Sequence, residues 1–203
     1  YIPMPNINEL AGINLLISIL QELIIGVSSG LLLKILFASA ELAGEKIAAS
    51  TGLSFAGLID PESGAQTPVI SQIFSMFMLL TFLSLNGHLV ALSILLESYK
   101  IFPIATSGFN LSIIKLGIDA GGLMFKFGAL IMLPVVVGIT LLNVVIGIVT
   151  RSAPSLNLFS FGFPITMISA FILLYLCTAT IGGNFDNVAE VGIDFIARLI
   201  EGL

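Results

Sequence analysis

No charged side chain interrupts the residues from Phe127 to Thr150, which read FGALIMLPVVVGITLLNVVIGIVT. A helix needs about 20 mostly apolar residues to cross the hydrocarbon core of a bilayer, so this run is long enough to span a membrane. Three further segments reach that length, and their apolar residues lie on all sides of a helical wheel, as in helices surrounded by lipid or protein. The first contains Glu22, Lys34 and Glu41, and the others contain no formal charge. These segments are 13–42, 69–96 and 156–181.

The composition of the chain excludes a soluble domain. Of its 203 residues, 57% are hydrophobic and only 9% are charged, and the mean hydropathy is +1.14. Soluble domains carry about 25% charged residues, and a chain with so few cannot cover a surface that faces water. With 7 basic and 12 acidic residues the net charge is −5, and no Lys/Arg cluster is present to bind nucleic acid or anionic lipid headgroups. Cys177 is the single cysteine, which excludes a disulfide framework.

Prolines and a change in composition interrupt the hydrophobic segments. Pro134 and Pro164 fall inside them and predict kinked or split helices, which membrane proteins tolerate where neighbouring helices satisfy the freed backbone groups. The tail, 184–203, has the periodicity of an amphipathic helix. We therefore predict an all-α fold of membrane-embedded helical hairpins with kinked or broken helices. The tail's apolar face carries Val188, Val191, Phe195, Leu199 and Leu203, and its polar face carries Asp186, Glu190, Asp194 and Arg198.

Small residues recur every four positions in and just after the first hydrophobic segment. Such stripes let helix backbones approach closely, which favours helix association in membranes. The residues leave two interpretations open: assembly with partner subunits, or packing within this chain. The positions are Gly26 and Gly30 in one pair, and Ala40, Gly44, Ala48 and Gly52 in a longer stripe.

Glu22 lies one helical turn before Gly26 and is surrounded by apolar residues. A carboxylate in such a setting is costly and usually faces protein or water. Glu22 is either a proton-relay site or a hydrogen-bonding partner of a neighbouring segment, and the structural role is the favoured interpretation. Lys34 lies too far along the same helix to pair with it directly.

No catalytic constellation is present in the sequence. His88 lies in Asn86-Gly87-His88 without a nearby Cys, Asp or Glu, so we interpret it as a polar break in a helix, not as a metal ligand or a triad member. No zinc-protease, nucleophile-elbow, phosphate-loop or dinucleotide motif occurs. The sequence therefore predicts no enzyme activity, no cofactor and no metal site.

The segment 50–67 combines loop-forming residues with apolar ones. Irregular backbone at membrane depth persists only where protein buries it or where it lines a cavity. The segment is therefore either a re-entrant, plug-like constriction or a connector that packs on its own subunit, and the residues alone slightly favour the connector. The positions that define it are Gly52, Leu53, Phe55, Leu58, Ile59, Asp60 and Pro61.

Short pieces spread over nearly the whole chain resemble the flagellar biosynthetic protein FliR family and its injectisome counterparts, the R/T-type subunits of type III secretion export gates. Each piece is weak alone, but their order and spacing together are specific, and one piece, residues 60–64, is closer to the flagellar branch. The pieces are Glu22-Leu-Ile-Ile-Gly-Val-Ser-Ser-Gly30, Ala43-Gly44-Glu45, Gly52-Leu-Ser-Phe55, Asp60-Pro-Glu-Ser-Gly64, Gln66-Thr-Pro-Val69, Asn86-Gly-His88, Phe102-Pro103, Leu133-Pro134, Arg151-Ser-Ala-Pro154 and Gly162-Phe-Pro164.

The resemblance implies that the whole chain, 1–203, is one non-enzymatic export-gate subunit in a helical hetero-oligomeric pore. In the family, P-type and Q-type subunits complete this assembly, which passes unfolded proteins out of the cytoplasm. The resemblance also implies contact with the large membrane subunit of the apparatus and with membrane lipid, but no nucleic-acid partner. It places the chain in the bacterial inner membrane at the flagellar basal body. It assigns 50–67 to the plug of the pore, with Phe55 as the aromatic residue of the plug, and so reverses the preference for a connector.

The chain begins with Tyr1 and lacks the N-terminal hydrophobic region of the family, so we interpret it as a fragment. The alternatives are an ion-coupled secondary transporter, with Glu22 and Lys34 as coupling residues, and the equivalent subunit of a virulence injectisome. Transporters often contain internal repeats, and none is apparent here. A transporter would purify alone or as a small homo-oligomer, whereas a gate subunit would co-purify with different chains.

Overall fold

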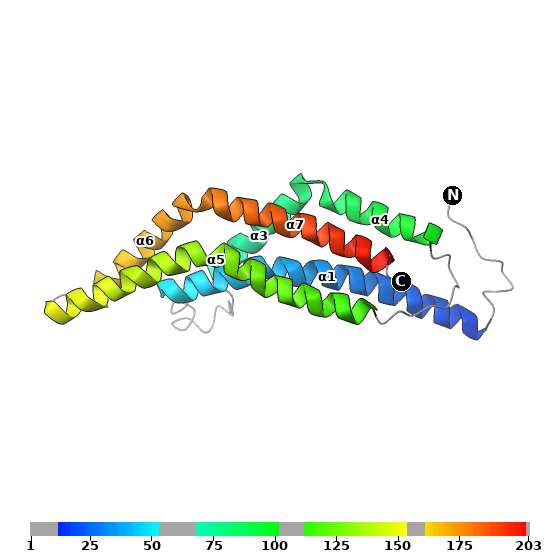
Figure 1. Ribbon diagram of the computed structural model, residues 1–203, viewed down its shortest axis with the longest axis horizontal. Coiled ribbons are helices and arrows are strands. Elements are labelled where there is room, and N and C mark those ends of the chain that lie inside the picture. The colour runs from blue at the N-terminus through cyan, green and yellow to red at the C-terminus, as the bar shows by residue number, and fades with distance from the viewer. Residues whose placement is uncertain (1–11, 53–67, 102–111, 154–160, 202–203) are drawn as a thin grey trace. The chain divides into compact units, whose positions relative to one another are not determined.

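The computed structural model describes residues 12–52, 68–101, 112–153 and 161–201, and no β-strand occurs among them (Figure 1). This confirms the predicted all-α fold class. In chain order the helices are α1 (Ile13–Thr51), α3 (Val69–Ser84), α4 (Gly87–Ile101), α5 (Ser112–Ser152), α6 (Phe163–Leu176) and α7 (Thr178–Glu201).

Two of these helices are long and apolar enough to cross a membrane, over Leu15–Thr51 in α1 and Ile114–Ser152 in α5. Two bent helix pairs meet the same criteria when each is counted as one span, with bends of 63° at the break between α3 and α4 and 62° at the break between α6 and α7. The described part of the chain thus contains up to four membrane-length spans, two of them broken. Broken helices are part of the predicted fold class.

The helices extend beyond the hydrophobic runs. α1 continues past Leu42 to Thr51, although this extension includes Glu45 and Lys46. Both charged side chains are exposed, while Ile47 and Ala48 on the inner side of the same turns are fully buried. The extension is therefore amphipathic, and a charge in the sequence does not mark the end of the helix.

The two prolines in the hydrophobic segments have different effects. α5 runs through Pro134 without interruption, so this proline does not split the helix. Pro164 lies in the first turn of α6, where the missing backbone N–H would have had no partner within the helix. Pro164 therefore helps to start α6.

The chain forms two compact units, and each is built from segments far apart in the sequence. Unit 1 contains Tyr1–Phe37, Leu80–Met124 and Asn187–Leu203, and unit 2 contains Ala38–Leu79 and Phe125–Asp186. Unit 1 therefore includes all of α4, and unit 2 includes all of α6.

The core of unit 2 contains a stripe of α5 in which every fourth residue is buried. Residues four apart lie on one face of a helix, so the stripe is the inner face of α5. In the same unit the rings of Phe74 in α3 and Phe185 in α7 meet edge to face, with their centroids 5.8 Å apart. At Gly128 of α5, an added Cβ would lie 2.9 Å from the Cδ2 of Leu42, which shows how closely α5 approaches α1. The stripe consists of Phe127, Ile131, Val135 and Ile139.

In unit 1, the apolar face of α7 lies in the core. Phe195 is 5% exposed and Leu199 is fully buried, whereas Asp194 and Arg198 are exposed and form an ion pair at 2.8 Å. This distribution agrees with the amphipathic pattern of the tail. A second contact in this unit is the edge-to-face packing of the rings of Phe37 and Phe82, whose centroids are 5.1 Å apart.

Candidate functional site

The end of α1 leads into the segment 50–67, which the resemblance assigns to the plug of the pore. Thr51 closes the helix and is 1% exposed, and Gly52 follows with a φ of +79°. A glycine in this left-handed conformation is a common helix terminator, because a side chain there would be strained. The chain therefore leaves α1 at a defined point, Gly52. The other plug positions, Leu53, Phe55, Leu58, Ile59, Asp60 and Pro61, lie outside the described residues.

The last carbonyls of α1 need partners from outside the helical ladder. The Thr51 hydroxyl donates to the carbonyl of Ala48 at 3.0 Å, and the Gly52 N–H donates to the carbonyl of Ala49 at 3.3 Å. The carbonyl of Ser50 accepts a hydrogen bond from the side-chain amide of Asn143 in α5, also at 3.3 Å. The first two donors belong to the helix end itself, whereas Asn143 lies 93 positions after Ser50 in the sequence.

A cavity of about 340 Å³ lies beside this helix end, within unit 2. Its wall is formed by the last turn of α1, one face of α5 and the beginning of α6. Three of the residues that line it carry polar side chains that belong to different helices or helix ends: Thr51, Asn143 and Thr166. The full lining is Ala49, Ser50, Thr51, Gly52, Asn143, Ile146, Gly147, Gly162, Phe163 and Thr166.

The longer small-residue stripe packs within unit 2. Ala40 and Ala48 are fully buried, and a Cβ added to Gly44 would lie 2.5 Å from the Cα of Ser71 in α3. The Ser71 hydroxyl donates to the carbonyl of Glu41 at 2.9 Å, and this bond holds the two helices at the same close approach. At Gly44, the packing partner is therefore a helix of this chain.

The pair Gly26 and Gly30 has a different environment. Both residues are exposed, and no atom lies within 4 Å of a Cβ added to either one. Large apolar side chains next to them, Leu23, Val27 and Leu31, are also exposed. Assembly with another chain thus remains a proposal for this pair.

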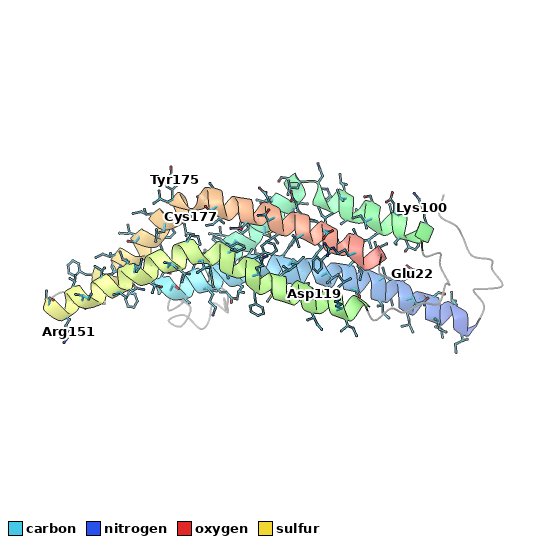
Figure 2. The ribbon with its side chains drawn as sticks, viewed as in Figure 1. Glu22, Lys100, Asp119, Arg151, Tyr175 and Cys177 are labelled. Atoms are coloured by element: carbon cyan, nitrogen blue, oxygen red, sulfur yellow. The ribbon has the colours of Figure 1, made fainter. Side chains whose placement is uncertain are left out.

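Glu22, which Figure 2 labels, lies on α1 and has a partner within unit 1. The hydroxyl of Tyr99, in α4, makes a side-chain hydrogen bond with Glu22, in α1. Among the residues that the structure describes, the one ion pair is Arg198–Asp194, which does not involve Glu22. The hydrogen bond with Tyr99 supports the structural interpretation of Glu22.

The break between α3 and α4 coincides with the polar tripeptide around His88. Asn86 has a φ of +55°, and a Cβ on Gly87 would clash with the ring of Phe82. Among the described residues, no group of His, Cys, Asp and Glu could hold a metal ion. The tripeptide lies where the backbone turns between α3 and α4.

The contacts of Asn143 and Tyr99 were not predicted from the sequence. For Asn143 a signal existed, because it is the one amide side chain in the uncharged run from Phe127 to Thr150. An amide in such a run needs a hydrogen-bond partner, which makes it a candidate for a tertiary contact. Tyr99 carries no such signal, since it lies in a mixed sequence between Glu97 and Lys100.

Known proteins resemble this chain over most of its length. The family described as "Bacterial export proteins, family 1" matches residues 2–191. The flagellar biosynthetic protein FliR of Escherichia coli (strain K12) is 36% identical over 183 residues, which cover 90% of this chain and 70% of the relative. FliR of Pectobacterium carotovorum subsp. carotovorum is 32% identical, covering 100% of the chain and 77% of the relative. FliR of Bacillus subtilis (strain 168) is 30% identical, covering 89% and 71%. This chain belongs to the bacterial export proteins, family 1.

Proposed function

We propose that this chain is a subunit of the export gate of the flagellar type III secretion apparatus, where it forms part of the channel and its plug. Membership in the family makes it a component of the flagellar export apparatus, and its membrane-length helices make it a membrane protein. The proposal adds a closed assembly with P-type and Q-type subunits and the large membrane subunit, in the inner membrane at the basal body. Unfolded proteins are the exported substrate, and the segment 50–67 is the plug.

The observation that carries the proposal is the match of nearly the whole chain to the family and to flagellar relatives. The exposed face around Gly26 and Gly30 adds physical support, because a bare, small-residue surface suits close contact with another helix. The helix end at Gly52 adds further support, since it gives the following segment a fixed starting point.

A self-contained transporter is not favoured. In that hypothesis Glu22 and Lys34 couple ion binding to transport, which requires that Glu22 be free to exchange its partners. The hydrogen bond from Tyr99 instead gives Glu22 a role in joining α1 to α4.

Purification of the tagged protein from bacterial membranes in mild detergent tests the assembly. We expect it to elute as a large complex that contains P-type and Q-type subunits in fixed ratio. A tagged, unrelated membrane protein from the same cells serves as the control for non-specific capture. Elution of the tagged protein as a homo-oligomer without other subunits would contradict the proposal and favour a transporter.

A further inference from the structure

Helices α1 and α3 meet at backbone contact distance within unit 2. A Cβ built on Gly44 of α1 would lie 2.5 Å from the Cα of Ser71 in α3 and 2.8 Å from its backbone nitrogen. No side chain separates the two backbones at this point. Small sliding movements of packed helices are a common form of conformational change. At Gly44 no layer of side chains lies between the two backbones to accommodate such a movement.

The residues one turn before and one turn after Gly44 oppose a shift of this contact along α1. Ala40 and Ala48 lie on the same face as Gly44, since residues four apart share a helix face, and both are fully buried. Each carries the Cβ atom that Gly44 lacks. A shift of Ser71 along α1 by one turn, about 5.4 Å, would bring its backbone against one of these Cβ atoms. The contact therefore has one position on this part of α1.

Glu41 reinforces the contact through two hydrogen bonds from α3. The Ser71 hydroxyl donates to the backbone carbonyl of Glu41 at 2.9 Å, and the Ser75 hydroxyl donates to its carboxylate Oε1, also at 2.9 Å. The two serines lie one turn apart on α3, so α3 binds a single residue of α1 at its main chain and at its side chain. Ser71 is 2% exposed, which limits the access of water to its bond. A shift of α3 by one turn would break both bonds.

The position of Glu41 in the chain makes its partner informative. Glu41 belongs to the membrane-length span Leu15–Thr51, and an ionisable side chain in such a span marks a functional site by default. Here the carboxylate has a partner in the same unit, the hydroxyl of Ser75. This hydrogen bond assigns Glu41 to the contact between α1 and α3.

We propose that these contacts lock α1 to α3, and that the parts of the two helices in unit 2, 38–51 and 69–79, move as one rigid pair when the gate opens. The statement about opening rests on the proposed function, whereas the lock itself concerns only contacts within unit 2. Opening then displaces other elements relative to this pair and does not slide α3 along α1. The lock consists of Glu41, Gly44, Ser71 and Ser75.

A double-mutant cycle on the purified protein in detergent tests the lock by itself. Glu41→Leu and Ser75→Ala each remove one side of the same hydrogen bond, so their effects on the unfolding equilibrium constant should not multiply. We expect a coupling of about threefold, the average for polar pairs between membrane helices. Glu41→Gln keeps an acceptor oxygen, so its own effect should be small and the coupling to Ser75→Ala should persist.

Glu45→Leu is the matched control for this cycle. Glu45 is exposed and lies one turn further along α1, so Glu45→Leu removes a carboxylate from the same helix without touching the bond between Glu41 and Ser75. We expect no coupling between Glu45→Leu and Ser75→Ala. A coupling for Glu41 that is no larger than that for Glu45 overturns the lock.

Covalent bridging tests the rigid pair in the assembled gate. Glu41→Cys and Ser75→Cys are combined with Cys177→Ser, which removes the native thiol, in cells that lack the native subunit. A short bifunctional thiol reagent then joins α1 to α3 at the position of the hydrogen bond, and mass spectrometry of the purified chain measures the extent of bridging. We expect export of flagellar proteins to continue at the rate of the single-cysteine chains treated with the same reagent.

The outcomes separate this inference from the proposed function. Export that stops in the bridged chain, but not in the treated single-cysteine chains, overturns the rigid pair, because it shows that α3 must move along α1. Failure of the parent chain to restore export in these cells contradicts the proposed function, and the double-mutant cycle then decides on the lock alone. Coupling in the cycle together with unchanged export after bridging supports both.

Discussion

Gly44 of α1 and Ser71 of α3 are so close that a Cβ added to the glycine would lie 2.5 Å from the Cα of the serine. Real Cβ atoms do not approach a backbone atom this closely, so the two helices would have to move apart. We expect Gly44→Ala to destabilise the protein by about 1–3 kcal/mol, as overpacking of a core does. Thermal unfolding of the purified protein in detergent measures the effect.

Gly26→Ala is the control for this prediction, because it makes the same change in the same helix where nothing lies within 4 Å. Alanine is the better helix former, so this variant should equal the parent or gain up to about 1 kcal/mol. If the two variants unfold at the same temperature, the close contact between α1 and α3 does not exist in the protein.

Gly52→Ala tests the helix end. At a φ of +79° an alanine costs about 1–2 kcal/mol, whereas asparagine visits this region more readily. We therefore expect the melting temperature to decrease in the order Gly52, Gly52→Asn, Gly52→Ala. Gly147→Ala is the matched control, since Gly147 lines the same cavity and has open space around it. Equal melting temperatures for Gly52→Ala and Gly147→Ala would argue against the left-handed helix end.

A double-mutant cycle tests the contact between Glu22 and Tyr99. Tyr99→Phe and Glu22→Ala each remove one side of the hydrogen bond, so their effects on stability should not add. We expect a coupling energy of about 0.6–1.7 kcal/mol, the range for polar pairs between membrane helices. Tyr175 is 80% exposed, so Tyr175→Phe serves as the control and should show no coupling to Glu22→Ala. A coupling energy near zero for Tyr99 would remove the assigned partner of Glu22.

The neighbouring residues Asp194 and Phe195 should respond very differently to truncation. Phe195 is 5% exposed, so Phe195→Ala leaves a cavity and should cost about 3–5 kcal/mol. The exposed ion pair of Asp194 with Arg198 contributes little, so Asp194→Ala should cost less than about 1 kcal/mol. Chemical denaturation in detergent measures the loss of stability in each variant. Similar losses for Phe195→Ala and Asp194→Ala would contradict an α7 that buries Phe195 and exposes Asp194.

Phe55 tests the proposed plug. A dry seal depends on apolar contact more than on one chemical group, because hydrophobic constrictions close pores by expelling water. Cells with the assembled gate should therefore leak small ions in the order parent, Phe55→Leu, Phe55→Ala, with deletion of 53–67 the most permeable. An assembled gate that stays as tight as the parent after this deletion would show that the segment is only a connector.

Features repeated along one helix could be predicted from the sequence. The burial of Phe195 and Leu199 follows from their spacing, because residues four apart share a helix face. The small-residue stripe likewise predicted the close approach at Gly44 but not its partner, since spacing defines a face and not what packs against it.

Contacts and breaks that depend on tertiary packing were harder to predict. The hydrogen bond from Asn143 to Ser50 joins positions 93 residues apart, and periodicity within one helix contains no information about such a pair. The break between α6 and α7 at Cys177 has no glycine or proline at that position, in contrast to the break at Asn86-Gly87. Its location depends on the packing of the helices on either side.

The way in which the two compact units share the chain has a consequence for biosynthesis. Unit 2 needs Phe185 of α7 to meet Phe74, and unit 1 needs the rest of α7 to cover residues before Phe37. Neither core can close while the ribosome is still making α7. The early helices must therefore wait in the membrane with incomplete packing, which is the stage at which long-range folds are most open to mispairing and to proteolysis. Stable accumulation of this subunit should thus depend on how quickly synthesis of α7 follows insertion of α1.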